Sequence, residues 1–499
     1  MAKDYHNSAE QMRDKLNNVS SSFCLAKWLQ VSLHLPQGLT QSCYHPPTHT
    51  IPLSELKRNP SALHNTNFKK QERKLMLKNE RPEGCSYCWK MEDNNHLSDR
   101  HYRSSEWWAE PNFDEVVARG ATDNITPRYV EVNFNQACNF KCMYCSPHLS
   151  STWEEDIEKH GAFKLGDKEH NNLDYLRKSG MMPLKLAQAE NPYVEAFWKW
   201  WPFIYRDLRV FRMTGGEPLM DKNTFKVLEY VNENPHGLLE LSITSNMCPP
   251  DDKLFEKFVG CVQDLEEIRT YEDLSNFNEN SGNSWYVAPA LKHFMLFISL
   301  DSVGNQAEYI RTGLDYEKLL NNTRTFLRST KFTSVTFINT FNILSIPNLD
   351  KFLELMLELR KEFGGRMQED FTMEIPGHPP YVHKKFKRVW FDVPVLRYPN
   401  WFSIQNIGQY GIDVVERCIS FMEQNCNQTE FEGFEQYEIL KLQRDLSLMK
   451  QELGADELKT NKADFIDFID ELDKRRSTSF KETFPQMAFY YDDCKLNGR

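Results

Sequence analysis

The sequence predicts an α/β protein built around parallel strands that form a full or partial barrel of six βα units. Three observations predict this class. Six short runs rich in β-branched and aromatic residues follow one another, amphipathic stretches separate them, and the region before them is rich in polar residues, proline and cysteine. We therefore expect a cysteine-rich region over 1–127, a partial barrel over 128–400 and a helical, charged region over 401–499.

The expected strands carry the barrel prediction. They lie at 128–134, 208–214, 239–246, 294–301, 334–344 and 371–376. Stretches such as 223–234 and 348–363 place apolar residues at helical spacing between them. Right-handed crossovers would order such units into a barrel with ligand sites at the C-terminal ends of its strands. Two longer insertions, 147–207 and 247–293, are therefore candidates for substrate contacts.

Charge and composition exclude several classes of protein. The net charge of -11 is spread over mixed stretches, which argues against a general nucleic-acid binder. The local basic stretch HKKFKR at 383–388 is interpreted as a solvated surface. The N-terminus is polar and no run of about 18 apolar residues occurs, so we expect a soluble, cytoplasmic protein without membrane contact.

Three cysteines lie close together directly after the first expected strand. Cys138, Cys142 and Cys145 form a C-x₃-C-x₂-C array in "CNFKCMYC". In a reducing cytosol such clustering favours metal or cluster ligation over disulfides. Three thiolates can serve three irons of a [4Fe–4S] cube and leave the fourth iron open. Zinc and a chance grouping of buried cysteines are the alternatives.

A second motif, "MTGGEP", follows the second expected strand. Gly215 and Gly216 lack a Cβ atom, so the backbone there can approach a ligand closely, and Pro218 stiffens the exit. Glu217 adds an acceptor suited to an ammonium group. A Gly-Gly turn alone is weak, but its position one strand after the cysteine array makes it a candidate cofactor site.

Together the two motifs resemble those of the radical S-adenosylmethionine (radical SAM) superfamily, over roughly residues 128–380. The resemblance implies that the cysteine array holds a [4Fe–4S] cluster whose open iron binds the amino and carboxylate groups of SAM. Reductive cleavage would then yield methionine and a 5′-deoxyadenosyl radical that abstracts hydrogen from a substrate. It also implies an electron donor such as flavodoxin or ferredoxin as a partner.

Other positions are similar to SAM contacts of the family. The resemblance assigns Ser245 and Asn246, in "SITSN", to the cofactor, and Ser299 and Asp301 to ribose or carboxylate oxygens. Arg311 would pair with the methionine carboxylate, because a guanidinium fork suits that group. Ser302 stands where many relatives have glycine. Strand-end capping or an ion pair is the alternative role for these polar residues.

Four further cysteines precede the barrel. Cys24 and Cys43, with Gly38 between them, and the C-x₂-C pair Cys85 and Cys88 supply four thiolates, enough to close a cluster or a zinc site. The C…G-x₄-C stretch resembles the opening of the auxiliary-cluster modules called SPASM and twitch domains, which in most relatives follow the barrel. The resemblance implies an auxiliary [4Fe–4S] cluster, with structural zinc as the main alternative.

The activity expected from this resemblance is hydrogen abstraction from a peptide or protein side chain. Oxidation of a small molecule such as a sugar or nucleotide is the closest alternative, and a non-catalytic iron–sulfur or zinc-binding interaction protein is another. Nucleic-acid modification is less favoured, and no catalytic acid or base is assigned.

The remaining features are interpreted as structural. Cys248, Cys261, Cys418, Cys426 and Cys494 have isolated spacing typical of small buried residues. The aromatic stretch 197–205 is interpreted as core. Within 464–485 an apolar helical stripe precedes Arg475 and Arg476, which suit either an anionic substrate or the C-terminal charge of a helix.

Overall fold

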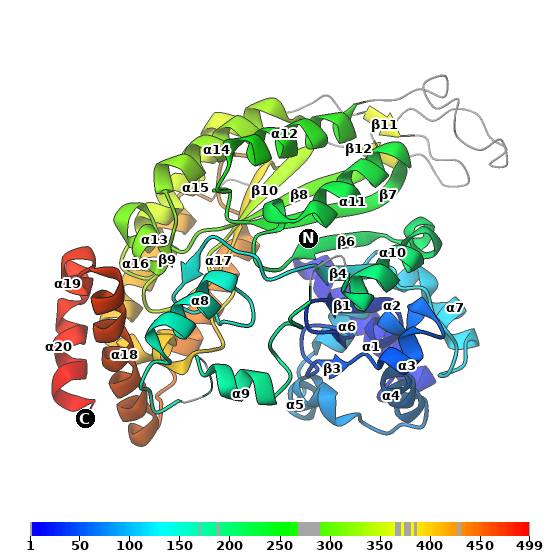
Figure 1. Cartoon of the computed structure of the whole chain (residues 1–499), viewed down its shortest axis with the longest axis horizontal. Helices are drawn as coiled ribbons and strands as arrows, with labels where there is room; N and C mark the ends of the chain where they lie inside the picture. Colours follow the sequence, from blue (N-terminus) through cyan, green and yellow to red (C-terminus); the bar gives the residue numbers. More distant parts are fainter. Residues whose placement is uncertain are drawn as a thin grey trace. The chain divides into compact units, whose positions relative to one another are not determined.

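The α/β class is confirmed by a large, mostly parallel sheet (Figure 1). The structure is a computed structural model that describes residues 2–167, 169, 171–186, 190–267, 290–364, 371–373, 381–383, 387–426 and 431–498. Its sheet has nine strands in the order β13-β10-β8-β7-β6-β4-β1-β2-β3.

The chain divides into two compact units. Unit 1 contains residues 1–135, 183–215 and 238–242, and unit 2 contains 136–182, 216–237 and 243–499. Strand β1 pairs with β4, so the N-terminal region and the first expected strand belong to the same compact unit.

Unit 1 contains the N-terminal region and two later segments of the chain. Its helices are α1 (Ala2–Val19), α2 (Leu25–Leu29), α3 (Leu53–Leu56), α4 (Asn67–Leu77), α5 (Ser86–Asp93), α6 (Asp99–Ser104), α7 (Phe113–Ala118) and α10 (Pro192–Ile204). Its strands are β1 (Gln30–His34), β2 (Leu39–Gln41), β3 (His49–Thr50), β4 (Tyr129–Asn133) and β6 (Val210–Thr214), with the middle of β7 (His236–Ser245). Strands β1, β4 and β6 run parallel, whereas β2 and β3 add antiparallel.

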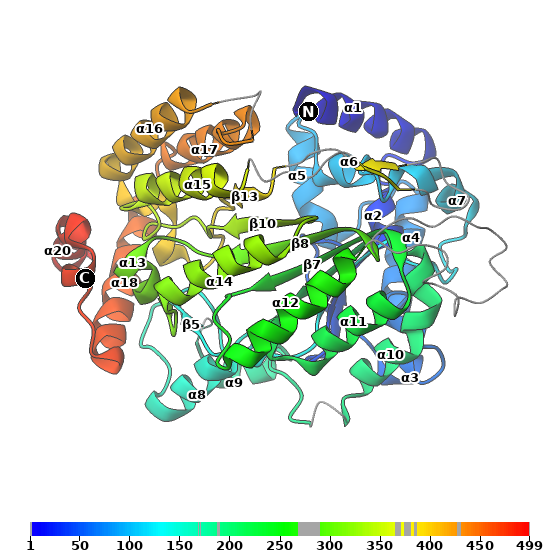
Figure 2. The same cartoon turned by 90° about the horizontal axis from the view of Figure 1, so that it is seen from above.

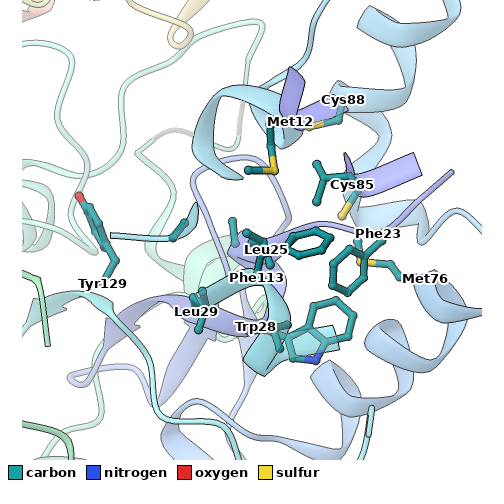
Figure 3. Close-up of a cluster of buried hydrophobic side chains, with 14 of the residues drawn as sticks. Met12, Phe23, Leu25, Trp28, Leu29, Met76, Cys85, Cys88, Phe113 and Tyr129 are labelled. Carbon is teal, nitrogen blue, oxygen red and sulfur yellow. The ribbon is translucent and has the colours of Figure 1, made fainter. Parts of the chain in front are cut away.

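Unit 1 has an apolar core to which residues of α1 and α2 contribute. Phe23, Trp28 and Phe113 pack there in tilted and edge-on arrangements, and Cys85 and Cys88 are buried in the same cluster (Figure 3). Two thiols of the N-terminal set therefore lie in a water-poor environment, where charge is costly. The aromatic stretch 197–205 is largely core, as expected, although Phe203 is 78% exposed.

Unit 2 holds the other parallel strands and most helices. Its helices are α8 (Ser151–His160), α9 (Leu173–Lys178), α11 (Lys222–Glu233), α12 (Asp252–Glu266), α13 (Gly304–Ile310), α14 (Tyr316–Ser329), α15 (Leu349–Phe363), α16 (Gln409–Gln424), α17 (Gln436–Met449), α18 (Ala455–Arg476), α19 (Phe480–Thr483) and α20 (Ala488–Asn497). Its strands are β5 (Lys141–Cys142), β8 (Leu291–Ser299), β9 (Arg311–Thr312), β10 (Thr333–Ile338), β11 (Phe371–Met373), β12 (Tyr381–His383) and β13 (Val389–Asp392). Strands β8, β10 and β13 are parallel, and α12, α14 and α15 lie along them (Figures 1 and 2).

Three helices of unit 2 begin at aspartate caps. The side chains of Asp221, Asp251 and Asp315 each accept a backbone N–H from the first turn of α11, α12 and α14. Such caps satisfy amides that have no partner inside the helix. Phe258 of α12 stacks on Phe326 of α14 with ring centroids 5.4 Å apart, so the two crossover helices share one apolar surface.

Two sequence predictions need correction in unit 2. The described part of the expected run 371–376 is the strand β11, but it pairs antiparallel with β12 in a separate two-stranded sheet, and β13 takes the place beside β10 in the large sheet. Residues 374–376 lie outside the described residues. The stretch 383–388 is not wholly a solvated surface either. Lys387 and Arg388 are 2% and 3% exposed because Glu435 and backbone carbonyls pair them, while 384–386 lie outside the described residues.

The apolar stripe near the C-terminus is core, as predicted. Phe465, Phe468, Ile469 and Leu472 of α18 are buried. Among the described residues, no helix is both long and apolar enough to cross a membrane.

A buried ion pair links α15 and α17. Arg360 and Glu438 are both fully buried, with Nη2 and Oε1 2.6 Å apart. We expect Arg360→Met to lower the free energy of unfolding by about 3–5 kcal/mol, because it leaves a buried carboxylate without its charge partner. Chemical denaturation measures this. Lys450→Ala, which breaks a half-exposed pair with Glu416, should cost less than about 1 kcal/mol, and equal losses would contradict the prediction.

Candidate metal centres

The cysteine array lies on a loop that follows β4, as the sequence predicts. Cys142 belongs to the short strand β5, which pairs antiparallel with β9, so that Cys142 faces Arg311 and Lys141 faces Thr312. The Met143 amide donates to the Ile310 carbonyl at 2.9 Å. The loop is thus fixed by backbone pairing at its centre.

The three thiols of this loop are electrostatic neighbours. All three cysteines are partly exposed, and burial of the thiol together with the charges of Cys142 and Cys138 raises the pKa of Cys145. Burial raises the pKa of Cys138 to about 12, and it also raises the pKa of Cys142, against the opposing effect of Arg311. The thiols are therefore protonated near neutral pH unless a bound cation compensates their charge.

Side chains at the start of α8 hold the loop from one side. The hydroxyls of Ser150 and Thr152 donate to the Phe140 carbonyl at 2.9 and 2.7 Å. The Trp153 indole N–H donates to the Cys142 carbonyl at 2.8 Å. The buried side chains of Phe140 and Met143 anchor the loop in the core, which leaves the cysteines on its accessible side.

The glycine motif makes a close backbone contact with the same loop. A Cβ atom on Gly216 would overlap the Ala137 carbonyl, and the Glu217 amide donates to that carbonyl at 2.7 Å. Gly215 has φ +131°, and a Cβ atom there would overlap Asn133. Pro218 begins a buried 3₁₀ turn after the motif. The glycines therefore allow the cysteine loop to lie against this turn. The sequence analysis had expected only a ligand to make such a close approach.

Glu217 is buried and engaged within the chain. One carboxylate oxygen accepts from the Ser245 hydroxyl and the Leu219 amide, and the other accepts from the Asn246 amide at 2.6 Å. Burial nevertheless raises its pKa to about 7. The side-chain amide of Asn246 donates to the side-chain oxygen of Asn139, in the cysteine loop, at 2.8 Å. Glu217 and Asn246 thus tie the ends of two strands to the loop.

Asp301 and Arg311 form a buried ion pair beside Cys142. Arg311 Nε and Asp301 Oδ2 are 2.8 Å apart, and Arg311 Nη1 donates to Cys142 Sγ at 3.4 Å. Tyr144 donates to Asp301 at 2.8 Å and accepts from Arg311, and the Thr340 amide also donates to Asp301. The alternative of an ion pair therefore holds for both residues. Ser299 ends β8 and is partly exposed.

The four N-terminal cysteines meet in unit 1. Cys24, Cys43, Cys85 and Cys88 line one cavity, together with Met76 and Trp89 among others. Burial raises the pKa of Cys43 to about 12 and also raises the pKa of Cys85 and Cys88, and the Cys24 charge acts in the same direction on all three. The structure thus brings together all four thiols from segments up to 64 residues apart in sequence (88 minus 24).

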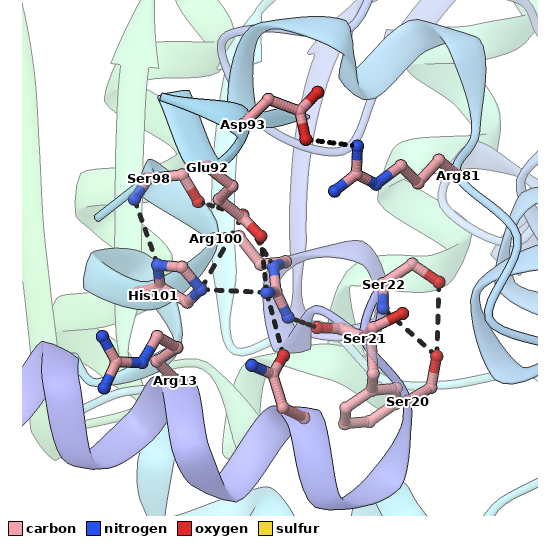
Figure 4. A network of polar contacts seen from close by, with 12 residues as sticks. Arg13, Ser20, Ser21, Ser22, Arg81, Glu92, Asp93, Ser98, Arg100 and His101 are labelled. Atoms are coloured by element: carbon pink, nitrogen blue, oxygen red, sulfur yellow. Dashed lines mark hydrogen bonds and ion pairs between the residues drawn. The ribbon is translucent and has the colours of Figure 1, made fainter. Parts of the chain in front are cut away.

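Hydrogen-bond donors surround these sulfurs. The amides of His45 and Arg100 donate to Cys43 and Cys88, and the Lys27 ammonium group donates to Cys85. The Lys27 ammonium also pairs with Glu72 at 2.7 Å. The Arg100 side chain is fixed by Glu92, His101 and Asn17 (Figure 4). Such donors stabilise thiolate sulfur in clusters and metal sites.

Both sets of cysteines have the donor chemistry of iron–sulfur ligands. Within the described ranges, no three His, Cys, Asp or Glu side chains converge on one point as a single metal ion requires. A four-iron cluster is larger than one ion and binds thiols that surround it. Of the isolated cysteines, Cys248, Cys418 and Cys494 are buried as expected, whereas Cys261 and Cys426 are partly exposed.

In comparisons with known proteins, the chain matches no family model, no curated protein and no solved structure.

Several residues around the sites escaped sequence reasoning. Tyr144 lies inside the array and could have been noticed there, since a phenol beside thiolates is a natural donor. Lys27 gave no local signal, because it reaches Cys85 from a distant segment. Trp153 lies near the array in sequence, but its bond to the Cys142 carbonyl was not foreseen. Arg476 was noted only as part of a basic pair, and its contact with the Lys141 carbonyl was not foreseen.

The contact at Gly216 yields a prediction about the loop. We expect Gly216→Ala to lower the free energy of unfolding by about 1–3 kcal/mol, because the new methyl group must displace the Ala137 backbone. Thermal and chemical denaturation of metal-free protein measure the change. Gly260→Ala is the matched control: nothing lies within 4 Å of its Cβ position on α12, and alanine favours a helix. A destabilising control, or a neutral Gly216→Ala, would contradict the prediction.

Proposed function

We propose that the chain is a radical SAM enzyme with a partial (β/α)₆ barrel. The observation that carries the proposal is the meeting of three thiols on one loop with polar groups from successive strand ends. Glu217, Ser245, Asp301 and Thr340 follow or end β6, β7, β8 and β10. They form two bonded pairs, Glu217 with Ser245 and Asp301 with Thr340, and each pair is linked to the loop. The sheet order β4-β6-β7-β8-β10-β13 follows the chain, as in a singly wound barrel.

Cys138, Cys142 and Cys145 would hold the cluster. A bound [4Fe–4S] cluster with one open iron supplies the electron that splits the sulfonium of SAM. The chain contributes the thiolates, and its glycine turn and α8 hold them in place. Arg311 lies next to Cys142 Sγ and favours its thiolate form.

The internal contacts refine the proposed cofactor residues. Glu217 already accepts from three donors, so an ammonium group would use its remaining acceptor capacity or displace Ser245. Arg311 is engaged by Asp301, and a cofactor carboxylate would share that guanidinium fork. We propose that both residues chiefly preorganise the loop and contact SAM at their edges. Asn246 and Ser299 are the other proposed contacts.

The N-terminal cysteines are proposed to bind an auxiliary [4Fe–4S] cluster. Four thiols, three N–H donors to sulfur and a largely apolar surrounding support a fully ligated, redox-active or structural cluster. Structural zinc has the same ligand demand and is the second candidate.

Hydrogen abstraction from a peptide or protein side chain is the proposed reaction, on the basis of the resemblance to auxiliary-cluster enzymes. A small molecule such as a sugar or nucleotide is the alternative substrate. We further propose a cytoplasmic location and reduction by a flavodoxin or ferredoxin, which suit twelve cysteines that are all free thiols.

Production of 5′-deoxyadenosine tests the proposed activity. Anaerobically reconstituted protein with SAM and dithionite should release 5′-deoxyadenosine and methionine. Cys142→Ala should reduce the yield to background, because the loop then lacks a cluster ligand. Cys261→Ala, which removes a partly exposed thiol on α12, should retain activity. No product from the wild-type protein at full iron loading would refute the proposal and favour a non-catalytic binding protein.

Iron analysis separates the two candidates for the N-terminal site. Two cubes give about eight irons per chain, whereas one cube and one zinc give about four irons and one zinc. Replacing both Cys85 and Cys88 by alanine should remove about four irons in the first case and the zinc in the second. An unchanged metal content would rule out both.

A further inference from the structure

The end of α18 contacts the cysteine loop. Arg476 Nη2 donates to the Lys141 carbonyl at 3.0 Å, and Nη1 donates to the Thr312 hydroxyl. Lys141 and Thr312 are register partners in the β5–β9 pair. One guanidinium group therefore bridges both strands of the pair, immediately beside the register pair of Cys142 and Arg311.

Trp153 lies beside this contact. Arg476 and Trp153 each donate to a backbone carbonyl of β5, that of Lys141 and that of Cys142. The Arg476 guanidinium lies 5.3 Å from the centroid of the Trp153 ring. The same indole donates to the Cys142 carbonyl. Two neighbouring side chains thus fix successive carbonyl groups of the strand that carries the central cysteine.

Arg476 has no carboxylate in direct contact within the described part of the chain. Its neighbour Arg475 pairs with Asp156 at 3.2 Å and with Glu471 at 2.8 Å. Asp156, whose charge also acts on Arg476, is shared with Lys141 at 2.7 Å. The Arg476 side chain is partly exposed, but its Nε is buried without a hydrogen-bond acceptor. A partly buried cation without a direct counter-charge is stabilised when an anion is bound nearby.

We propose that Arg476 is a positioning residue for the cluster loop, and that its positive charge finds its counter-charge in the thiolate-ligated cluster held at Cys142. This inference rests on the proposed function. Reduction makes a cluster more negative, so a nearby cation stabilises the reduced form and raises the reduction potential. Arg475, neutralised by two carboxylates, should have little effect on that potential.

Reduction potentials of three variants test the proposal. Arg476→Gln removes the charge, Arg476→Lys keeps it, and Arg475→Gln is the matched control on the same helix end. The reduction potential of the SAM-responsive cluster is measured by electron paramagnetic resonance in a redox titration. We expect a shift to more negative potential in Arg476→Gln, a smaller shift in Arg476→Lys and none in Arg475→Gln. The N-terminal cluster, when it is iron–sulfur, serves as an internal reference that does not shift.

Equal shifts in Arg476→Gln and Arg475→Gln, or no shift in Arg476→Gln, would overturn the inference. If Arg476→Gln does not assemble the cluster, hydrogen exchange of metal-free protein decides. Faster exchange over 141–143 than in the wild type supports the positioning role, and unchanged exchange overturns it. Failure of the proposed function is distinguishable, since wild-type protein would then bind no iron at the array or form no 5′-deoxyadenosine despite an intact cluster.

Discussion

The buried ion pair between Asp301 and Arg311 is the contact on which the cysteine loop depends. The loop has little secondary structure of its own, so its shape must come from what surrounds it. Asp301 is fully buried. Its carboxylate pairs with Arg311 and accepts hydrogen bonds from the Tyr144 hydroxyl and the Thr340 amide. In a low-dielectric environment such a satisfied network is rigid, whereas a broken one leaves an unpaired charge. The pair therefore fixes Cys142 through Arg311 and the array through Tyr144.

The two groups of cysteines differ in the way that their proposed roles require. The loop array offers three thiols on a partly exposed segment, so a proposed four-iron cluster held there would keep one iron open to a small ligand. The N-terminal set offers four thiols, two of them buried in an apolar core, with N–H donors supplied by the protein. An open site suits chemistry on a bound cofactor, and a closed site suits electron transfer or structural support.

Much of the parallel sheet could be predicted from sequence, and its edges could not. Five of the six expected runs coincide with β4, β6, β7, β8 and β10, because β-branched and aromatic residues recur there at the buried positions of the strands. The described part of the sixth run, 371–373, pairs locally with β12, and β13 was hidden in a stretch that begins with Lys387 and Arg388. Those cations are buried because they contact Glu435 and backbone carbonyls, and the sequence around 387–388 does not reveal these partners. Strand β1 was missed because its partner β4 lies about 100 residues further along the chain (129 minus 30).

The candidate site shows the same limit more sharply. The cysteine spacing supplied the proposed ligands, since thiol chemistry is a property of the residues themselves. The electrostatics of the array come instead from remote parts of the chain: Arg311 is 169 residues from Cys142, and Arg476 is 335 residues from Lys141. Each contact closes a long loop, whose entropic cost rises only slowly with length, so distant residues can serve as well as near ones. A motif therefore specifies which atoms can bind a cluster, whereas the charge around it is decided by the fold of unit 2 through its last long helix, α18.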